Sequence, residues 1–329
     1  MYAAWYEQQG PAEEVLHVGE MEMPVPGPGE VLVRVRISGI TPSDAKRRRA
    51  YRGQPMGFAR IIPHSDGSGV IAAVGSEVAS SRVGERVWLW NAQFGRPFGT
   101  AAEYVVLPAA QAVPLPDHVD FEIGACLGIP ALTAHRALFA DGPIRGQTIL
   151  IAGGAGTVGH AAIQLAKWAG ATVISTVSSA EKGEVALAAG ADVVLNYQRE
   201  DVAARIGEIT RGQGVDRIVE VALGPNMQLD TRTIKPNGVI AAYDSESEAF
   251  PPLPFFELMV RNITLHLILV YTMSATAHEQ AIAGVSAALE AGALRPLIGA
   301  RFPLEEIVQA HQTIEHHQHI GNVILDIAG

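Results

Sequence analysis

Residues 147–182 have the sequence QTILIAGGAGTVGHAAIQLAKWAGATVISTVSSAEK, and this stretch decides the fold. Residues 148–152 form a short apolar run rich in β-branched side chains, which predicts a buried strand. The motif GAGTVG follows at 154–159, and residues 160–169 then carry apolar side chains at helical spacing. A second apolar run at 172–177 predicts another strand, so the stretch is a strand–helix–strand unit.

The GAGTVG motif fits the G-x-G-x-x-G fingerprint of a dinucleotide site. In such a site one glycine makes a tight turn, another lets the backbone approach the diphosphate, and the last lets helix and strand pack closely. The diphosphate binds at the helix N-terminus, where free N–H groups and the helix dipole favour anions. Because 34 of the 329 residues are glycine, the motif alone could also be a plain turn; the flanking strands and helix favour the dinucleotide site.

The residues after the second strand indicate which dinucleotide binds. A site for NAD usually has Asp or Glu there, which binds the ribose 2′-hydroxyl. Here STVSS at 175–179 contains no acid, and Lys182 follows it. Hydroxyls and an ammonium group favour a 2′-phosphate, so we predict NADPH as the cofactor. Alternatively, Ser178 and Ser179 cap the next helix, with Glu181 in its first turn. The two roles are compatible, because both use the free N–H groups of that turn.

Length and composition bound the class of protein. A chain of 329 residues is long enough for about two domains with large cores. Its 48% hydrophobic and 18% charged residues are typical of an ordinary enzyme, and its net charge of −10 argues against a nucleic-acid partner. The single cysteine, Cys126, excludes a disulfide within the chain and a cysteine zinc cluster, and it lies in an apolar run typical of a core.

Targeting signals are not apparent in the sequence. The N-terminus lacks a basic region followed by an apolar core, so we expect no signal peptide. The apolar stretch at 265–270 is too short to span a bilayer. We therefore expect a cytoplasmic protein that does not insert into a membrane.

The chain divides into two kinds of pattern. Residues 1–122 predict a β-rich domain of short strands with Gly and Pro turns, at 31–37, 70–74, 83–90 and 104–107. Residues 123–271 alternate between strands and helices, which predicts an α/β, doubly wound, six-stranded parallel sheet. Its strands are expected at 148–152, 172–177, 192–196, 217–221, 238–243 and 265–271. Residues 272–329 begin with a helix at 277–291 and end in a strand, helix and strand at 297–302, 303–315 and 323–327, which we expect to complete the first domain.

Several motifs along the whole chain carry a family resemblance. They are GITPSD at 39–44, PHSDGSGVI at 63–71, residues 75–87 with VGERV at the end, GIPALTAHRAL at 128–138, the fingerprint, GADVVLNY at 190–197, and Ala310-His311. On these motifs the chain resembles the medium-chain dehydrogenase/reductase superfamily, and within it the zinc-free, ζ-crystallin-like NADPH:quinone oxidoreductases. The resemblance implies a GroES-like catalytic domain into which a Rossmann domain is inserted.

The resemblance also bears on zinc. Alcohol dehydrogenases of this superfamily hold a catalytic zinc with a Cys near the position of Asp44 and a His in a G-H-E-G-x-G stretch. Here the stretch is HSDGSG, Ser65 stands in place of that His, and no Cys lies near residue 41 or 44. Zinc needs three or four ligands in tetrahedral reach, so we expect no metal. We interpret His64 as a loop histidine lining the cleft, with Asp66 also near the substrate.

A site without a metal must act on an acceptor that is already electrophilic, such as a quinone or an α,β-unsaturated carbonyl. The developing oxyanion then needs hydrogen-bond donors. By resemblance these come from the segment after strand 31–37, and the candidates are Thr41, where the family often has Asn, and Tyr51. Their alternative roles are a turn hydroxyl and a packed ring. Lys46 stands where the family often has a cofactor-contacting Tyr.

Two clusters of basic residues allow more than one interpretation. Lys46 to Arg49 with Arg52 could draw in an anionic cofactor or substrate, but a solvated helix face is the favoured interpretation. His316, His317 and His319 flank a predicted helix end, and we interpret them as surface residues. In some relatives the neighbourhood of His317 contacts the 2′-phosphate, which leaves that role open.

The remaining cofactor contacts follow from the resemblance. They are Thr133 at the nicotinamide half; Ala155, Gly156, Thr157, Val158 and Gly159 at the diphosphate; Ser178, Lys182 and Tyr197 at the adenosine phosphate; Asn226 after the fourth strand; Tyr243 and Asp244 after the fifth; and the backbone of Leu267, Ile268 and Leu269 at the carboxamide.

The leading hypothesis is hydride transfer from NADPH to a quinone. A close alternative is reduction of the C=C bond of 2-alkenals or enones. A different class is a non-catalytic NADPH-binding or structural protein, and a zinc alcohol dehydrogenase is disfavoured by the missing ligands. The apolar stretch at 265–270 would be an edge strand, and exposed apolar edges favour pairing, so we expect a homodimer.

Overall fold

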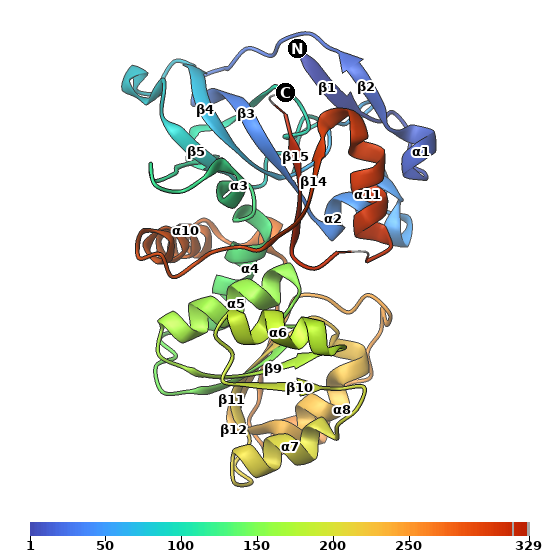
Figure 1. Ribbon diagram of the computed structural model, residues 1–329, viewed down its shortest axis with the longest axis vertical. Helices are drawn as coiled ribbons and strands as arrows, with labels where there is room; N and C mark the ends of the chain where they lie inside the picture. The colour runs from blue at the N-terminus through green and yellow to red at the C-terminus, as the bar shows by residue number, and fades with distance from the viewer. Residues whose placement is uncertain (318, 328–329) are drawn as a thin grey trace. The chain divides into compact units, whose positions relative to one another are not determined.

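The computed structural model describes residues 1–317 and 319–327, and the chain folds into two compact units (Figure 1). The first unit is Met1–Ile129 with Pro296–Gly329, and the second is Pro130–Arg295. The sequence suggested 123–271 for the inserted domain, so the bounds of the second unit differ at both ends. At the C-terminal end the reason is helix α10 (Ala275–Glu290): a Cβ on its Gly284 would lie 2.1 Å from Nε2 of His135, so α10 packs on helix α4 (Gly128–Phe139).

The second unit contains the predicted six-stranded parallel sheet. Its strands are β8 (Thr148–Ala152), β9 (Thr172–Val177), β10 (Val193–Asn196), β11 (Val215–Glu220), β12 (Ile234–Ala242) and β13 (Thr264–Leu267). Their order across the sheet is β10-β9-β8-β11-β12-β13, with every neighbouring pair parallel. This is the doubly wound order, in which the direction of strand addition reverses between β8 and β11. The fold class predicted from the sequence is confirmed.

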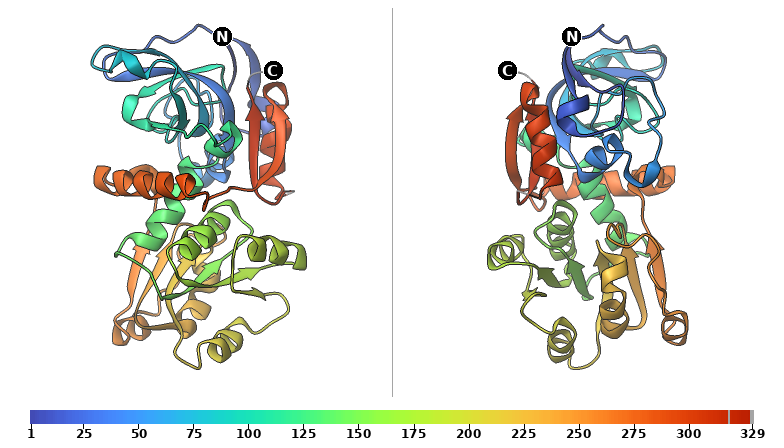
Figure 2. Two further views of the ribbon diagram at one scale, coloured as in Figure 1. Left: turned by 60° about the vertical axis from the view of Figure 1, so that its left-hand side comes forward. Right: turned by 90° about the vertical axis from the view of Figure 1, so that its right-hand side faces the viewer.

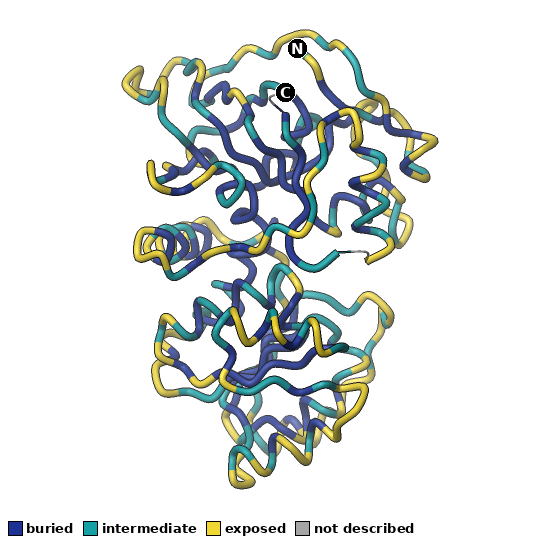
Figure 3. The backbone as a smooth tube through the Cα atoms, viewed as in Figure 1, coloured by how far each residue is buried: buried dark blue, intermediate teal, exposed yellow. Residues whose placement is uncertain are grey.

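Helices cover both faces of this sheet. They are α5 (Thr157–Trp168), α6 (Ala180–Ala188), α7 (Val202–Ile209), α8 (Leu223–Thr233) and α9 (Phe255–Val260). Helices α5 and α6 contact each other and one face, whereas α7 and α8 contact each other and lie on the opposite face (Figures 1 and 2). Strands covered on both faces must be apolar on both faces, and β8 accordingly has Ile149, Leu150 and Ile151 fully buried. Figure 3 shows the strands of this sheet as a buried layer.

The first unit is built on strands that pair antiparallel, except that β14 pairs parallel with β15. They are β1 (Tyr2–Trp5), β2 (His17–Glu20), β3 (Glu30–Ile40), β4 (Asp66–Val74), β5 (Arg86–Leu89), β6 (Tyr104–Pro108), β7 (Ala112–Pro114), β14 (Ile298–Pro303) and β15 (Asn322–Asp326). Its short helices are α1 (Ala12–Val15), α2 (Pro42–Arg48), α3 (Phe121–Gly124) and α11 (Ile307–Glu315). Strands β14-β15-β3-β4-β5-β7 form one sheet in that order, and β6 also pairs with β3.

Strand β14, helix α11 and strand β15 belong to the first unit, whereas the helix at 277–291, which the sequence analysis also assigned to that unit, lies in the second. Strand β15 pairs antiparallel with β3, with Ile324 opposite Gly39 and Val323 opposite Ile40. The red β14, α11 and β15 lie beside the blue and cyan strands in both views of Figure 2. Strand β3 is therefore central: β4 pairs along one side of it, and β6 (at residues 30–34) and β15 (at residues 37–40) share the other side.

Two predicted strands are longer than the structure supports. The strand expected at 83–90 is Arg86–Leu89, because residues 80–82 form a 3₁₀ turn ahead of it. The strand expected at 265–271 ends at Leu267; the N–H of Ile268 still bonds the carbonyl of Ala242, and the chain then turns into a 3₁₀ segment at Val270–Thr272. Strand β13 is the edge strand that the sequence predicted. Among the described residues, no helix has the length and apolar character needed to cross a membrane.

Candidate functional site

The turn between β8 and α5 is shaped for close backbone approach. A Cβ on Gly159 would lie 2.3 Å from the carbonyl oxygen of Gly153, and a Cβ on Gly154 would lie 2.0 Å from Oγ of Ser175. Gly153 itself has a φ of 68°, in the left-handed region that favours glycine. Side chains at these positions would force the turn apart, so the fingerprint glycines have a steric reason in this chain.

The same turn leaves the start of α5 open to an anion. The N-cap residue is Gly156, which has no side chain that could cap the helix. Thr157, Val158 and Gly159 form the first turn, whose N–H groups lack partners within the helix. Ala155 is buried in the turn just ahead of them. These features fit a dinucleotide diphosphate, which binds backbone N–H groups at a helix N-terminus.

The end of β9 brings the predicted adenosine-phosphate residues together. Ser179 is the N-cap of α6 and accepts from the backbone N–H of Lys182 at 3.3 Å, so the capping role suggested by the sequence holds for this serine. Ser178 instead accepts from Nζ of Lys182 at 3.2 Å. Asn196, the last residue of β10, lies opposite Val177, the last residue of β9. The next residues, Tyr197 and Ser178, therefore lie at the same edge of the sheet, and Tyr197 is 53% exposed. A hydroxyl, an ammonium and a phenol thus belong to residues at this end of the sheet, and residues 178–180, directly after β9, contain no carboxylate.

The other predicted cofactor residues of this unit lie at the ends of β11, β12 and β13. Nδ2 of Asn226 donates to the carboxylate of Glu220, the last residue of β11. Tyr243 donates its N–H to the carbonyl of Glu220, and the carbonyl of Asp244 accepts from the N–H of Leu223. Leu267, Ile268 and Leu269 follow from β13 at the same edge of the sheet. Thr133 is buried in α4, ahead of the first strand.

The first unit holds the two residues predicted to face the substrate. Thr41 is the N-cap of α2, where its N–H and its hydroxyl both donate to Oδ2 of Asp44 at 2.8 Å. This is a capping box, and both residues are buried. Burial raises the pKa of Asp44, whereas Arg47 and the bonds from Thr41 lower it. The geometry therefore gives the Thr41 hydroxyl the turn role that the sequence left open.

Tyr51 lies between two cations. Nζ of Lys46 is 5.2 Å from the centre of its ring, and the guanidinium carbon of Arg52 is 5.1 Å from it. Both distances are within the range of cation–π contacts. Ala50 and Arg52 have φ values of 54° and 55°, so the backbone around Tyr51 is held in the left-handed region.

A buried chain of polar side chains crosses the first unit and was not expected. Nε of Arg48 donates to Nδ1 of His311 at 3.4 Å, and Nε2 of His311 lies 3.0 Å from Nε2 of His64. Nδ1 of His64 lies 2.9 Å from the hydroxyl of Ser38, which bonds Thr100 at 2.7 Å. Because arginine only donates, His311 carries its proton on Nε2 and His64 carries its proton on Nδ1.

These buried polar side chains correct two interpretations made from the sequence. His64 does not line a cleft: it is fully buried, has a φ of 77°, and burial lowers its pKa to about 3. The basic run is not a solvated face throughout, because Arg48 is fully buried and ion-paired with Glu315. Arg49 is exposed, as expected for such a face. Sequence periodicity could not place Arg48, since its side-chain partners His311 and Glu315 are about 260 residues away along the chain.

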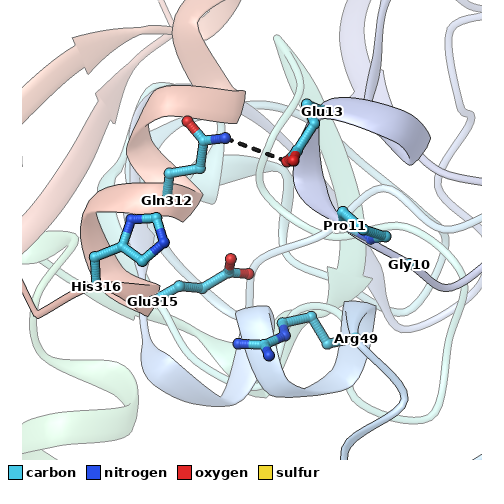
Figure 4. A pocket seen from close by; sticks show the side chains of 7 residues that line it. All are labelled: Gly10, Pro11, Glu13, Arg49, Gln312, Glu315 and His316. Atoms are coloured by element: carbon cyan, nitrogen blue, oxygen red, sulfur yellow. Dashed lines mark hydrogen bonds between the residues drawn. The ribbon is translucent and has the colours of Figure 1, made fainter.

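A pocket of about 300 Å³ lies beside these buried polar side chains, at the C-terminal ends of α2 and α11 (Figure 4). Its lining consists of Gly10, Pro11, Glu13, Arg49, Gln312, Glu315 and His316. Nε2 of Gln312 donates to Glu13 at 3.2 Å across its rim. Its lining holds none of the residues predicted for cofactor or substrate. His316 and His317 are exposed, as predicted.

Comparison with known proteins agrees with both halves of this description. The family described as "Alcohol dehydrogenase GroES-like domain" matches residues 27–117, and the family described as "Zinc-binding dehydrogenase" matches residues 157–287. The quinone oxidoreductase of Mus musculus is 32% identical over 322 residues, which cover 94% of this chain and 92% of that protein. The chain belongs to the medium-chain dehydrogenase/reductase superfamily. Within this superfamily it is of the quinone-oxidoreductase type.

Other members of the superfamily vary in what they are named for. A 2-haloacrylate reductase of a Burkholderia species is 30% identical over 333 residues, covering 99% of this chain and 98% of that protein. A mycobacterial structure complexed with NADPH has a TM-score of 0.87 and 30% identity over 99% of both chains. A structure described as an NAD-dependent alcohol dehydrogenase has a TM-score of 0.90 and 28% identity over 100% of both chains. The superfamily and its fold are thus shared by proteins that differ in substrate and cofactor.

Within residues 1–317 and 319–327, no three His, Cys, Asp or Glu side chains are grouped so that they could hold a metal ion. Cys126 is buried in the core, as predicted, and donates to the carbonyl of Glu122 at 3.2 Å.

Proposed function

We propose that this protein is a zinc-independent oxidoreductase that uses NADPH to reduce a quinone. One observation carries the choice of NADPH: the open, glycine-lined start of α5 lies on the same sheet edge as Ser178 and Lys182, with no acid in the residues directly after β9, at 178–180. An ammonium and hydroxyls bind a 2′-phosphate, which a carboxylate would repel. The mycobacterial neighbour complexed with NADPH supports this choice.

In this proposal, different residues of the second unit bind different parts of the cofactor. Bound NADPH supplies a hydride from C4 of its nicotinamide. Residues 155–159 bind the diphosphate through the first turn of α5, and Ser178, Lys182 and Tyr197 bind the adenosine phosphate. Asn226, Tyr243 and Asp244, the backbone of Leu267, Ile268 and Leu269, and Thr133 contact the remaining parts.

The proposed acceptor is one that needs no Lewis acid. Ser65 stands where zinc enzymes of this superfamily have a His, and no Cys lies near residue 41 or 44. A quinone or an enone accepts hydride without a metal, whereas a plain ketone would need polarisation. Donors to the reduced oxygen are proposed to be Thr41 and Tyr51, of which Tyr51 is the stronger candidate because the Thr41 hydroxyl already donates to Asp44.

A second candidate function is reduction of an activated C=C bond. The 2-haloacrylate reductase relative favours it, since that protein is named for an α,β-unsaturated acid.

The sheet edge formed by β13 is proposed to pair with a second copy, because Leu267 and Leu269 are 74% and 56% exposed beside an unpaired strand. A cytoplasmic location also remains a prediction.

The test is NADPH oxidation, followed by its absorbance with purified protein. The acceptors are an ortho-quinone, a para-quinone and a 2-alkenal, and each assay is repeated with NADH. Turnover of a quinone faster than of the alkenal, with NADPH preferred over NADH, is the expected result. Binding of NADPH without turnover of any acceptor would refute the enzyme and favour a non-catalytic NADPH-binding protein. Faster turnover with NADH would refute the cofactor assignment.

A further inference from the structure

Two buried carboxyl groups meet beneath the cofactor edge of the second unit. Glu220 ends β11 and Asp230 lies in α8, and their exposures are 1% and 0%. Asp230 lies one helical turn after Asn226, whose amide bonds Glu220, so both carboxyl groups lie where α8 packs against β11. Two carboxylates close together and out of water cannot both be ionised, because their repulsion is not screened. One proton must therefore be shared by this pair.

The hydrogen-bond donors around the pair decide which group carries the proton. Oε1 of Glu220 accepts from the N–H of Ala222 at 2.5 Å, and both of its oxygens accept from Nδ2 of Asn226 at 3.0 and 3.1 Å. Neither oxygen of Asp230 accepts an N–H or hydroxyl bond from any of the described residues. Donors stabilise the ionised form of a carboxyl group, and their absence favours the neutral form. Glu220 is thus the carboxylate, and Asp230 is the neutral acid beside it.

Electrostatics agree with this assignment. Burial, and then the charge of Glu220, raise the pKa of Asp230 well above its usual range. The other ionisable groups near Glu220 come from the end of β12: Tyr243, whose pKa burial and Glu220 raise, and Asp244, which acts on Tyr243. Arg261, which follows α9, donates to the carbonyl of Thr231 in α8. Tyr243, Asp244 and Arg261 are therefore the neighbouring ionisable groups to be distinguished from Asp230 when the affinity for NADPH changes with pH.

The pair is linked to the dinucleotide turn through Val221, the residue after Glu220. Val221 follows Glu220, and its Cγ1 would lie 3.4 Å from a Cβ placed on Gly153 of the fingerprint turn. Glu220 also fixes the amide of Asn226, because a carboxylate only accepts and must face the NH₂ group. The oxygen of that amide is then left as an acceptor at the end of β11, beside β8, where the order of the strands reverses.

We propose that Asp230 is a positioning residue for the dinucleotide. As a neutral acid it holds Glu220 in place, and Glu220 holds the segment from Val221 to Asn226 beside the diphosphate turn. The proposal rests on the proposed function in that the ligand is NADPH. If Asp230 ionises, it repels Glu220, and the segment it holds moves out of register with Gly153.

The experiment compares dissociation constants for NADPH from neutral to alkaline pH. Wild-type affinity is expected to fall as pH rises through the ionisation of Asp230. Asp230→Asn keeps a donor toward Glu220 and cannot ionise, so it should bind at neutral pH as wild type does and stay flat in the alkaline range. Asp230→Leu is close in size but has no donor, and it should bind about tenfold or more weakly at every pH. Asp201→Asn, at an exposed helix N-cap in the same unit, is the control and should keep the wild-type profile.

A second measurement reports on the proton itself. The infrared spectrum of wild type minus that of Asp230→Asn should contain the carbonyl band of one protonated carboxylic acid at neutral pH, and this band should vanish on alkaline titration. Absence of the band would overturn the shared proton. Wild-type binding that does not change with pH, or Asp230→Leu binding like wild type, would overturn the positioning role alone. Wild-type protein that binds no dinucleotide would refute the proposed function and the positioning role together, while the infrared band would still decide the proton.

Discussion

The charge of Lys182 should separate NADPH from NADH. Its Nζ bonds Ser178 at 3.2 Å, at the end of β9 where the ribose of a dinucleotide lies. Replacing Lys182 with Ala removes the ammonium and leaves the N-cap bond to Ser179 intact, because that bond uses the backbone N–H. The change is therefore confined to the phosphate contact.

The expected size follows from the exposure of the side chain. A hydrogen bond to a charged group contributes about 1.5–3 kcal/mol. Lys182 is half-buried, so solvent and salt screen part of this, and a loss of about 1–2 kcal/mol is expected. That corresponds to about 5–30-fold in the dissociation constant of NADPH. NADH has no 2′-phosphate, so its affinity should change by less than about twofold.

Calorimetric titration of both cofactors at low and at high salt provides the measurement. The NADPH effect should shrink at high salt, because screening already weakens the contact in wild type. Lys167→Ala is the matched control: this lysine of the same unit bonds Asp192 and the carbonyl of Ala171, at the other end of β9. Equal losses for NADPH and NADH in Lys182→Ala, or no loss for either, would refute the assignment of the phosphate site.

Four further outcomes are expected. Gly159→Ala should abolish dinucleotide binding and lower the melting temperature, since its Cβ would lie 2.3 Å from a backbone carbonyl oxygen; calorimetry measures both. Because burial lowers the pKa of His64 to about 3 and that of His311 well below its usual value, the unfolded state binds more protons, so the free energy of unfolding should fall as pH drops from about 6.5 toward 3 in urea titrations. Leu267→Lys should give a monomer by light scattering if two copies pair through β13, whereas an unchanged mass would exclude that edge. Thr41→Val should cost about 1 kcal/mol of stability, because the hydroxyl that donates to Asp44 is lost; a kcat loss beyond the stability effect is expected if Thr41 donates to the substrate, and an unchanged kcat would leave Tyr51 as the proposed donor.

Most of the fold could be predicted from local patterns in the sequence. The strand–helix–strand stretch at 147–182 was predictable because each element is specified by its own periodicity and by glycines that meet backbone within the same turn. The alternation that follows it specified a parallel sheet, and the handedness and order of such sheets leave few topologies. The identity of the residues after β9 was likewise local, so the cofactor edge could be anticipated residue by residue.

Burial and proton positions were decided only by the tertiary structure. Arg48 and His64 are unremarkable loop and helix residues in sequence, yet Arg48 meets His311 and Glu315 from the far end of the chain and the four form one buried network. In the sequence Asp230 is an ordinary acidic residue of a predicted helix. Only the packing of α8 on β11 buries it near Glu220, which accepts hydrogen bonds from the N–H of Ala222 and the amide of Asn226. Charge state in a protein depends on desolvation and on which donors are near, and neither quantity exists until distant segments have packed together.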